Sequence, residues 1–264
     1  MGARMSEVCV VHLVWAPYGP ELLRRFLASL RAVPAGCEHE LLVVFNGFPG
    51  EVGEEFLGEL AGVPHRALVL PEPVLDLAAY RAALDATQAG VVCFTNSYAE
   101  ALVESWLATL VGALGPDIGL AGASGSWESA FSSAPLELRV QRFLEFPRFP
   151  NPHLRTNAFL GRRELLLQLA WDGVDSKLGA LVLESGRRSL TRQVRRLGLR
   201  TVVVGRDGRL VEPGEWAHSA TFRSGDQGQL LVSDNRTRDY AQAGPAERRR
   251  LARMAWGRCA PVAY

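Results

Sequence analysis

The sequence lacks the short motifs that mark several large enzyme classes. It has no GxxxxGK[ST] phosphate loop, no GxGxxG turn after a strand, no GxSxG elbow and no HExxH helix. The GASGS run at 122–126 is glycine-rich but does not have the spacing of a dinucleotide site. These absences argue against P-loop, dinucleotide-dependent, α/β-hydrolase and zinc-protease chemistry.

Cysteine and lysine are scarce. The four cysteines, Cys9, Cys37, Cys93 and Cys259, are widely spaced and form no CxxC pair. The spacing therefore predicts neither a disulfide framework nor a zinc site, and a reducing cytoplasm is the expected location. Lys177 is the only lysine, so almost all basic residues are arginine. Arginines can bind phosphate or carboxylate, but codon bias in a GC-rich organism would produce the same composition.

Long apolar runs and a strong charge are also missing. No apolar run reaches the ~18–20 residues of a membrane-spanning helix. The few polar residues before Val8 have no apolar core segment, so we predict no signal peptide. The formal net charge is +1, which gives no global reason to expect a nucleic acid or an anionic membrane as partner. The sequence leaves the oligomeric state open.

Short β-branched apolar runs alternate with amphipathic stretches through the first half of the chain, and 48% of the 264 residues are hydrophobic. This pattern predicts an α/β domain whose mixed, mostly parallel sheet is flanked by helices, with ligands at the carboxyl ends of the strands. The predicted strands are Val8–Val14, Leu41–Phe45, Arg66–Leu70, Val91–Phe94, Ile118–Ala121 and Thr201–Gly205. The predicted helices begin at Glu21, near Glu51, at Asp76 and at Trp106, and further helices lie at Arg162–Leu169, Ser189–Leu197 and Glu247–Trp256.

Five segments, taken in order, resemble the family 2 glycosyltransferases, which have the GT-A fold. They are ELLVVFNGF (40–48), LDLAAYRAALDATQAGVVCFTNSY (75–98), the WLATLVGAL and IGLAGA segments (106–123), RTNAFLGRREL (155–165) and ESGRRSLTRQVRRLGLR (184–200). The resemblance implies a nucleotide-sugar-binding and catalytic domain over residues 1–206. It implies that residues 207–264 form a C-terminal lid or helical extension of the same domain.

Two positions depart from the family pattern. The family usually ends its second strand with an aspartate that pairs with the nucleotide base, and this chain has Phe45 there. The aspartate-rich metal-binding turn is replaced by Thr95-Asn96-Ser97-Tyr98. The resemblance implies Mg²⁺ or Mn²⁺, but hard cations prefer anionic oxygen ligands, so these neutral residues support such a metal only weakly.

The resemblance implies a donor site at the carboxyl ends of the strands. Its candidate residues are Pro17, Asn46, Asp76, Arg81, Asn96, Ser97, Tyr98 and Arg223. Each has an ordinary alternative: Asn96 and Ser97 are turn formers, Asp76 can cap a helix, and Arg81 can form a surface ion pair. Arg223 belongs to a polar C-terminal cluster with His218 and Arg236, whose arginines could neutralise a leaving diphosphate.

Trp127 and Glu128 are the candidate acceptor-binding residues, because an aromatic ring can stack on a sugar and a carboxylate can hold its hydroxyl groups. The alternative is a surface loop anchored by one tryptophan. Glu184 is the candidate catalytic base, which would deprotonate the acceptor hydroxyl. Its alternative is a carboxylate at a helix start, stabilised by the helix dipole. The segment NPHLRTN (151–157) is either part of the acceptor pocket or a structured loop.

We therefore predict a cytoplasmic hexosyltransferase-type enzyme that moves a sugar from a nucleotide-sugar donor to a hydroxyl acceptor, with inversion. The acceptor would be a precursor of a cell-surface polysaccharide or a small metabolite. Arginines and loop N–H groups would stabilise the leaving diphosphate in place of a metal. The main alternative is a non-catalytic relative that binds a sugar or a partner protein. A nucleotidyltransferase is less well supported, because no glycine-rich phosphate loop follows the first strand.

Overall fold

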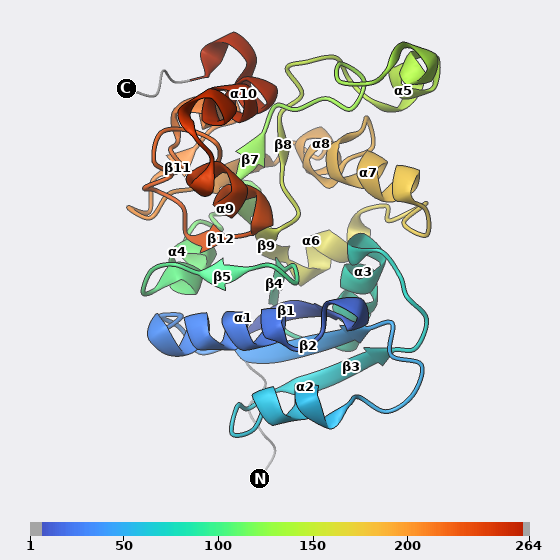
Figure 1. Cartoon of the computed structure of the whole chain (residues 1–264), viewed down its shortest axis with the longest axis vertical. Coiled ribbons are helices and arrows are strands. Elements are labelled where there is room, and N and C mark those ends of the chain that lie inside the picture. Colours follow the sequence, from blue (N-terminus) through green and yellow to red (C-terminus); the bar gives the residue numbers. More distant parts are fainter. Residues whose placement is uncertain (1–6, 261–264) are drawn as a thin grey trace.

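The computed structural model describes residues 7–260, and its centre is an eight-stranded mixed sheet (Figure 1). The strand order is β11-β10-β6-β9-β4-β1-β2-β3. Parallel pairs join β1 to β2 and β4, β2 to β3, and β6 to β10, whereas β9 and β11 run antiparallel to their neighbours. The strands are β1 (Val8–Trp15), β2 (Glu40–Asn46), β3 (Arg66–Leu70), β4 (Val91–Thr95), β6 (Ile118–Gly122), β9 (Ala158–Arg162), β10 (Arg200–Val204) and β11 (Leu210–Val211).

Helices cover both faces of this sheet, which confirms the predicted fold class. On one face lie α1 (Glu21–Ala32), α2 (Glu54–Glu59) and α4 (Trp106–Gly112). On the other lie α3 (Asp76–Ala86), α6 (Arg163–Gln168), α7 (Lys177–Ser185) and α8 (Leu190–Arg196).

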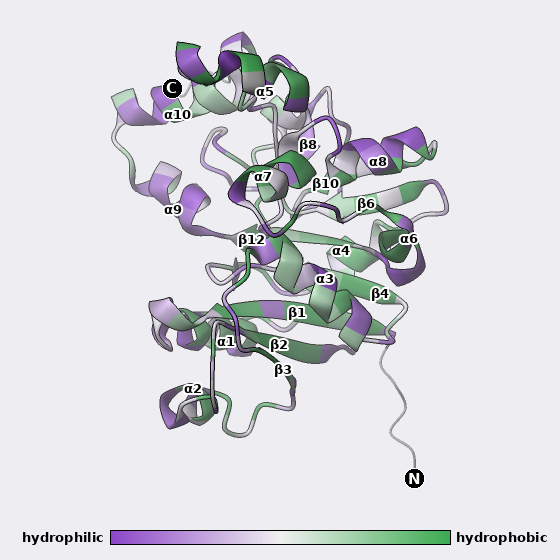
Figure 2. Ribbon diagram, turned by 90° about the vertical axis from the view of Figure 1, so that its right-hand side faces the viewer, coloured by the Kyte–Doolittle hydropathy of each residue, from purple (hydrophilic) through white to green (hydrophobic). Residues whose placement is uncertain are grey.

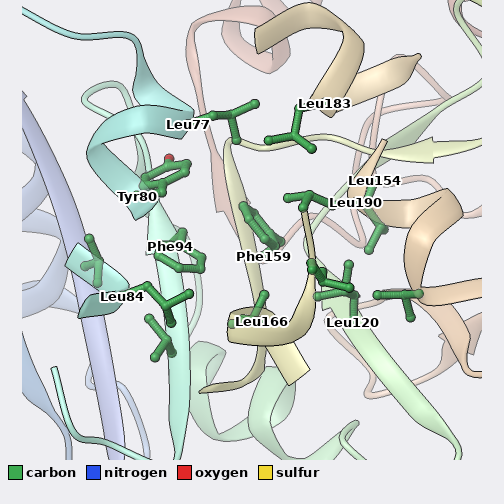
Figure 3. Close-up of a cluster of buried hydrophobic side chains, with 14 of the residues drawn as sticks. Leu77, Tyr80, Leu84, Phe94, Leu120, Leu154, Phe159, Leu166, Leu183 and Leu190 are labelled. Carbon is green, nitrogen blue, oxygen red and sulfur yellow. The ribbon is translucent and has the colours of Figure 1, made fainter. Parts of the chain in front are cut away.

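Side chains alternate along each strand, so β1 contributes to both cores. Cys9, Val11 and Leu13 join the apolar cluster under α3, α6, α7 and α8. Val10 and Val14 join the cluster under α1 and α4. Figure 3 shows the first cluster, in which Tyr80 of α3 and Phe159 of β9 pack against Phe94 of β4. Burial on both faces explains why these strands are almost continuously apolar in sequence.

The segment after β10 joins the rest of the domain through backbone and tryptophan contacts. Strand β11 extends the main sheet, and β12 (Val232–Ser233) pairs with β5 (Glu100–Ala101). Trp127 Nε1 donates to Pro213 O at 2.8 Å, and the Trp127 ring packs edge-on against Trp256, with centroids 5.5 Å apart. Two helices, α9 (Asn235–Gln242) and α10 (Pro245–Trp256), complete this part.

The remaining elements are short. They are the strands β7 (Gly125–Ser126) and β8 (His153–Leu154), the helix α5 (Arg139–Glu145), and the 3-10 turns η1 (Ala16–Tyr18), η2 (Leu136–Leu138), η3 (Trp216–His218) and η4 (Gly257–Cys259). Within residues 7–260, no helix is both long enough and apolar enough to cross a bilayer.

The helix α7 was not predicted, and its presence changes the interpretation of Glu184. Residues Lys177–Ser185 form this helix, capped at its start by Ser176, whose hydroxyl accepts from Gly179 N. Glu184 is the penultimate residue of α7. The alternative that it is a helix-start carboxylate is therefore wrong, because the dipole at a helix C-terminus disfavours negative charge.

A fully buried histidine connects β1 to the core. The ring of His12 stacks on Phe26 of α1, with centroids 3.6 Å apart. Its Nδ1 lies 3.2 Å from Thr95 Oγ1, and that hydroxyl donates to Val11 O at 2.9 Å. Nδ1 is therefore the protonated nitrogen, and Nε2 is buried without a partner among the described residues. Burial lowers the pKa of His12 to about 3.

This buried ring makes stability sensitive to mild acid. Below a pH of about 6.5 the unfolded chain binds a proton at His12, and the folded chain does not until its own pKa of about 3. The free energy of unfolding should therefore fall by about 2 kcal/mol from this residue alone between pH 7.5 and pH 5. Urea unfolding at the two pH values measures the loss.

The variant His12→Phe keeps the stacking on Phe26 and should remove most of this pH dependence, whatever its stability at pH 7.5. A variant that loses as much stability as the wild type between the two pH values would contradict the assignment.

Candidate functional site

The turns after β1 and β4 meet near the start of α3. The rings of Tyr18 and Tyr98 lie 5.2 Å apart. Hydrogen bonding to Tyr98, burial and the nearby charge of Asp76 raise the pKa of Tyr18 to about 12. Asp76, Tyr18 and Tyr98 therefore form one polar corner at the carboxyl edge of the sheet, where the sequence predicted a donor site.

Three other predicted donor residues have different surroundings. Asn46 is buried, and its amide accepts from Val74 N at 2.9 Å and donates to Val74 O at 2.7 Å. It therefore holds the loop that leads into α3. Arg81 forms an ion pair with Asp85 one turn along α3. Pro17 is exposed in the turn η1.

The turn after β4 is held by hydrogen bonds within itself and to two other parts of the chain. Asn96 N donates to Asn157 O at 3.0 Å, and Asn96 Oδ1 accepts from Tyr98 N at 3.1 Å. Ser97 is buried. Arg238 Nη1 donates to Tyr98 O at 3.1 Å, which connects the turn to α9.

This turn does not fit a divalent cation. A hard cation at a phosphate site is usually held by one or two carboxylates besides the phosphate oxygens, and Asn96 and Ser97 are neutral. The nearby Glu100 already pairs with Arg25 and Arg238 at 2.5 and 2.8 Å. Among residues 7–260, no group of three or more His, Cys, Asp or Glu side chains is placed to hold a metal. The described donor set therefore disagrees with the metal that the resemblance implies.

Glu184 lies between two cavities. The first has a volume of about 300 Å³ and borders the polar corner through Asp76. The second has a volume of about 330 Å³ and lies toward the C-terminal part of the chain. Glu184 and Leu181 of α7 line both. The first is also lined by Leu75, Leu77, Thr156, Lys177 and Ala180, and the second by Glu128, Ser129, Ala130, Ser133, His153, Arg155, Ser185, Phe222, Arg223, Arg236 and Met254.

One oxygen of Glu184 is held and the other is available. Thr156 donates to Glu184 Oε1 through its hydroxyl at 3.1 Å and its N–H at 3.4 Å. No hydrogen bond to Oε2 is found among the described residues. Desolvation by the surrounding protein raises the pKa of Asp76, and the negative charge of Glu184 raises it further. Asp76 is nevertheless partly accessible to solvent. Two carboxyl groups thus face one cavity.

His153 contributes an uncharged imidazole to the second cavity. Its Nδ1 donates to Asn151 O at 2.8 Å, so Nε2 carries the lone pair. Burial lowers the pKa of His153, and this effect outweighs the opposing influence of Glu184. A neutral histidine beside Glu184 can accept a hydrogen bond from a hydroxyl group.

Two arginines line the second cavity, and each forms an ion pair with an acidic residue far away in the sequence. Arg223 Nη1 lies 2.9 Å from Glu128 Oε1, and its side chain is 6% exposed. Its Nε is buried without a partner among the described residues. Arg155 Nη2 lies 2.6 Å from Asp234 Oδ2, and its guanidinium stacks on the Phe222 ring at 4.1 Å. Arg236 also borders the cavity and is exposed.

The structure separates the two predicted acceptor residues. Glu128 lines the second cavity. Trp127 is buried, packs edge-on against Trp256 at 5.5 Å between centroids, and lines neither cavity. Sequence reasoning did not single out Thr156, and it noted His153 and Arg155 only within the 151–157 loop. The polar content of that loop was the available signal.

The buried pair between Arg155 and Asp234 gives a stability prediction. Arg155→Met leaves the fully buried Asp234 without its cation and should cost about 3–5 kcal/mol of unfolding free energy. The double variant Arg155→Met/Asp234→Asn should recover part of that loss. Arg24→Met, which removes the surface ion pairs of Arg24 with Glu21 and Glu59, should cost less than about 1 kcal/mol.

Urea unfolding of the four proteins measures these differences. Equal losses for the exposed and the buried arginine would contradict a structural role for the buried pair.

Comparison with known proteins shows the fold. No protein-family model and no curated protein sequence matches the chain. Among solved structures, a mannosyltransferase from Pyrobaculum calidifontis in complex with GDP-Man and Mn²⁺ aligns with a TM-score of 0.50 and 14% identity, over 84% of this chain and 61% of that one. This chain thus spans about three fifths of that protein's length.

Two further alignments have lower TM-scores. Glucosyl-3-phosphoglycerate synthase from Mycobacterium tuberculosis, in complex with Mn²⁺, UDP and glucosyl-3-phosphoglycerate, gives 0.46 at 19% identity, over 76% of this chain and 70% of that one. A galactosyltransferase in complex with donor and acceptor sugar analogs gives 0.47 at 11% identity, over 75% and 73%. The strand order and the likeness to the mannosyltransferase together show that this chain has the GT-A fold of nucleotide-diphospho-sugar transferases.

Proposed function

We propose that the chain is a family 2-like glycosyltransferase that moves a hexosyl group from a nucleotide-diphosphate sugar to a hydroxyl acceptor. The observation that carries this proposal is the place of Glu184, which lines both of two adjoining cavities. A direct displacement needs a carboxylate where the donor's anomeric carbon meets the acceptor hydroxyl. The GT-A fold and its ligand-binding sheet edge support the same assignment.

In this proposal the donor sugar enters from the polar corner of Tyr18, Tyr98 and Asp76, and the acceptor occupies the second cavity. Glu184 Oε2 takes the proton of the acceptor hydroxyl while the acceptor oxygen bonds to the anomeric carbon. The bond from that carbon to the diphosphate oxygen breaks on the opposite side, so the configuration inverts. Thr156 keeps the carboxylate oriented through Oε1.

Positive charge for the leaving diphosphate would come from Lys177, which lines the first cavity with Asp76 and Glu184. Arg223 and Arg236 border the second cavity and would therefore meet the acceptor. Pre-positioned cations and N–H groups stabilise a developing anion without rearranging during the reaction. We include metal independence in the proposal, because the turn after β4 supplies neutral groups in place of carboxylates. The free cysteines among residues 7–260 are consistent with a reducing cytoplasm as the site of action.

A non-catalytic sugar-binding protein is the second candidate, and Phe45 favours it. This residue replaces the usual base-pairing aspartate and lies in a cluster with Phe48 and Phe56, with ring centroids 5.3 and 6.4 Å away. The base would therefore lose a hydrogen-bonding carboxylate at the end of β2. Binding and turnover experiments separate the two candidates.

Nucleotide-sugar binding should be visible as thermal stabilisation. At a concentration 100-fold above its Kd, a ligand adds about 2.7 kcal/mol to the stability of the folded protein, which should raise the Tm by about 5 °C or more. We expect one of the UDP-, GDP-, dTDP- or CMP-sugars to give such a shift, equally with and without Mn²⁺. If none of them moves the transition, the donor assignment fails. A shift seen only with Mn²⁺ would overturn metal independence.

Turnover should depend on Glu184. With the stabilising donor and a set of hydroxyl acceptors, Glu184→Gln should lower kcat by roughly 10²–10⁴-fold, because the amide cannot accept the proton. It should leave the donor-induced thermal shift in place. The exposed Glu164→Gln in α6 is the matched control and should behave as the wild type.

A Glu184→Gln variant with near-normal turnover would remove Glu184 from the base role. Binding with no turnover by the wild type against any acceptor would favour the non-catalytic candidate.

A further inference from the structure

Large apolar side chains are exposed together on one short segment. In η2 and α5, Leu136 and Val140 are 77% and 80% exposed, and Leu144 is 69% exposed. Their spacing of four residues places them on one side of this helical segment. Leu138 and Phe143 are also exposed. Contiguous exposed apolar surface of this kind usually marks an interaction site.

Arginines surround this apolar stripe. Arg139 belongs to α5 itself and is exposed, whereas Nη1 of Arg142, in the same helix, is buried. The Arg148 guanidinium lies 5.8 and 5.9 Å from the ring centroids of Phe131 and Phe143, and Arg187 lies 5.8 Å from Phe143. Cations held against the aromatic rings keep positive charge at the edge of the apolar surface.

The basic helix α10 lies at the same end of the molecule. Figures 1 and 2 both place α5 and α10 at this end and α2 at the opposite end. Arg249, Arg253 and Met254 are exposed on α10. With Ala246 and Arg250 they line a groove of about 420 Å³. The net charge of +1 for the whole chain conceals this local concentration of arginine.

We propose that the face formed by residues 136–144 and the exposed side of α10 docks on an anionic lipid bilayer. The stripe supplies apolar side chains that enter the acyl boundary, and the arginines supply contacts with acidic headgroups. A protein partner would more often meet a compact apolar centre with a polar rim. Here apolar side chains and arginines extend across two separate elements, which suits a planar charged surface.

Docking in this way would orient the second cavity. Ala130 and Ser133, which precede η2, and Met254 of α10 all line it. This step rests on the proposed function: a docked transferase would receive an acceptor that is held in the membrane. The docking itself is independent of turnover, and its test needs no substrate.

Vesicle co-sedimentation of the full chain tests the proposal. We expect binding to phosphatidylcholine vesicles that contain phosphatidylglycerol, weaker binding as salt increases, and little binding to phosphatidylcholine alone. The triple variant Leu136→Ser/Val140→Ser/Leu144→Ser should bind at least about tenfold more weakly, because these side chains no longer enter the acyl boundary. Arg249→Gln/Arg253→Gln should lose roughly tenfold or more on anionic vesicles.

The control is Leu57→Ser in α2, which removes an exposed leucine from the opposite end and should bind as the wild type. Failure of the wild type to sediment with anionic vesicles overturns the proposal, as does an equal loss in the Leu57→Ser control. Sedimentation velocity without lipid tests for self-association. If the wild type forms a dimer, the triple variant does not, and neither binds vesicles, the face is a self-association surface and the proposal is wrong.

Donor-induced thermal shifts of the same variants keep the two proposals separate. A triple variant that keeps its melting temperature and its donor response, but loses vesicle binding, supports docking. If no nucleotide sugar binds but the vesicle results hold, docking stands without the transferase assignment.

Discussion

The buried ion pair between Arg155 and Asp234 holds the candidate site together. Its partners are 79 residues apart, and each has a second task. Asp234 caps α9 by accepting from Thr237 N at 2.8 Å, and Arg155 covers the Phe222 ring. Burial opposes ionisation of Asp234, but the charge and hydrogen bond of Arg155 outweigh it and lower the pKa of this carboxyl. This interaction thus connects the C-terminal segment to the loop between β8 and β9.

Much of the sheet could be predicted because strands that are buried on both faces are almost continuously apolar in sequence. Runs such as Val8–Val14 and Val91–Phe94 are β-branched and apolar, and the structure has strands there with ends within one residue. The helix α7 gave no comparable signal. Gly179 lies inside it, where glycine weakens a helix, and the chain before it contains Gly173 and Asp175. The cap from Ser176 and tertiary packing against α3 and α8 stabilise that segment as a helix.

The candidate site was less predictable, because its pairs join residues far apart in the chain. The contact between Glu128 and Arg223 spans 95 residues, and no local pattern announces it. Sequence reasoning named Glu184 as the candidate base, but it had no means of showing that two cavities meet there. Likewise, the sequence predicted that Trp127 stacks on an acceptor sugar beside Glu128. In the structure its large ring is buried against Trp256.

The two hydrogen bonds between the Asn46 side chain and the Val74 backbone restrict how the edge of the sheet can move. Both hydrogen bonds join β2 to the residues just before α3, and the Asn46 side chain that makes them is buried. Moving this side of the sheet edge would break both hydrogen bonds at once and leave the buried amide unpaired, which is costly. The wall that contains Asp76 is therefore preorganised: the entropy of ordering it is lost when the chain folds, and a ligand that enters there does not lose it again.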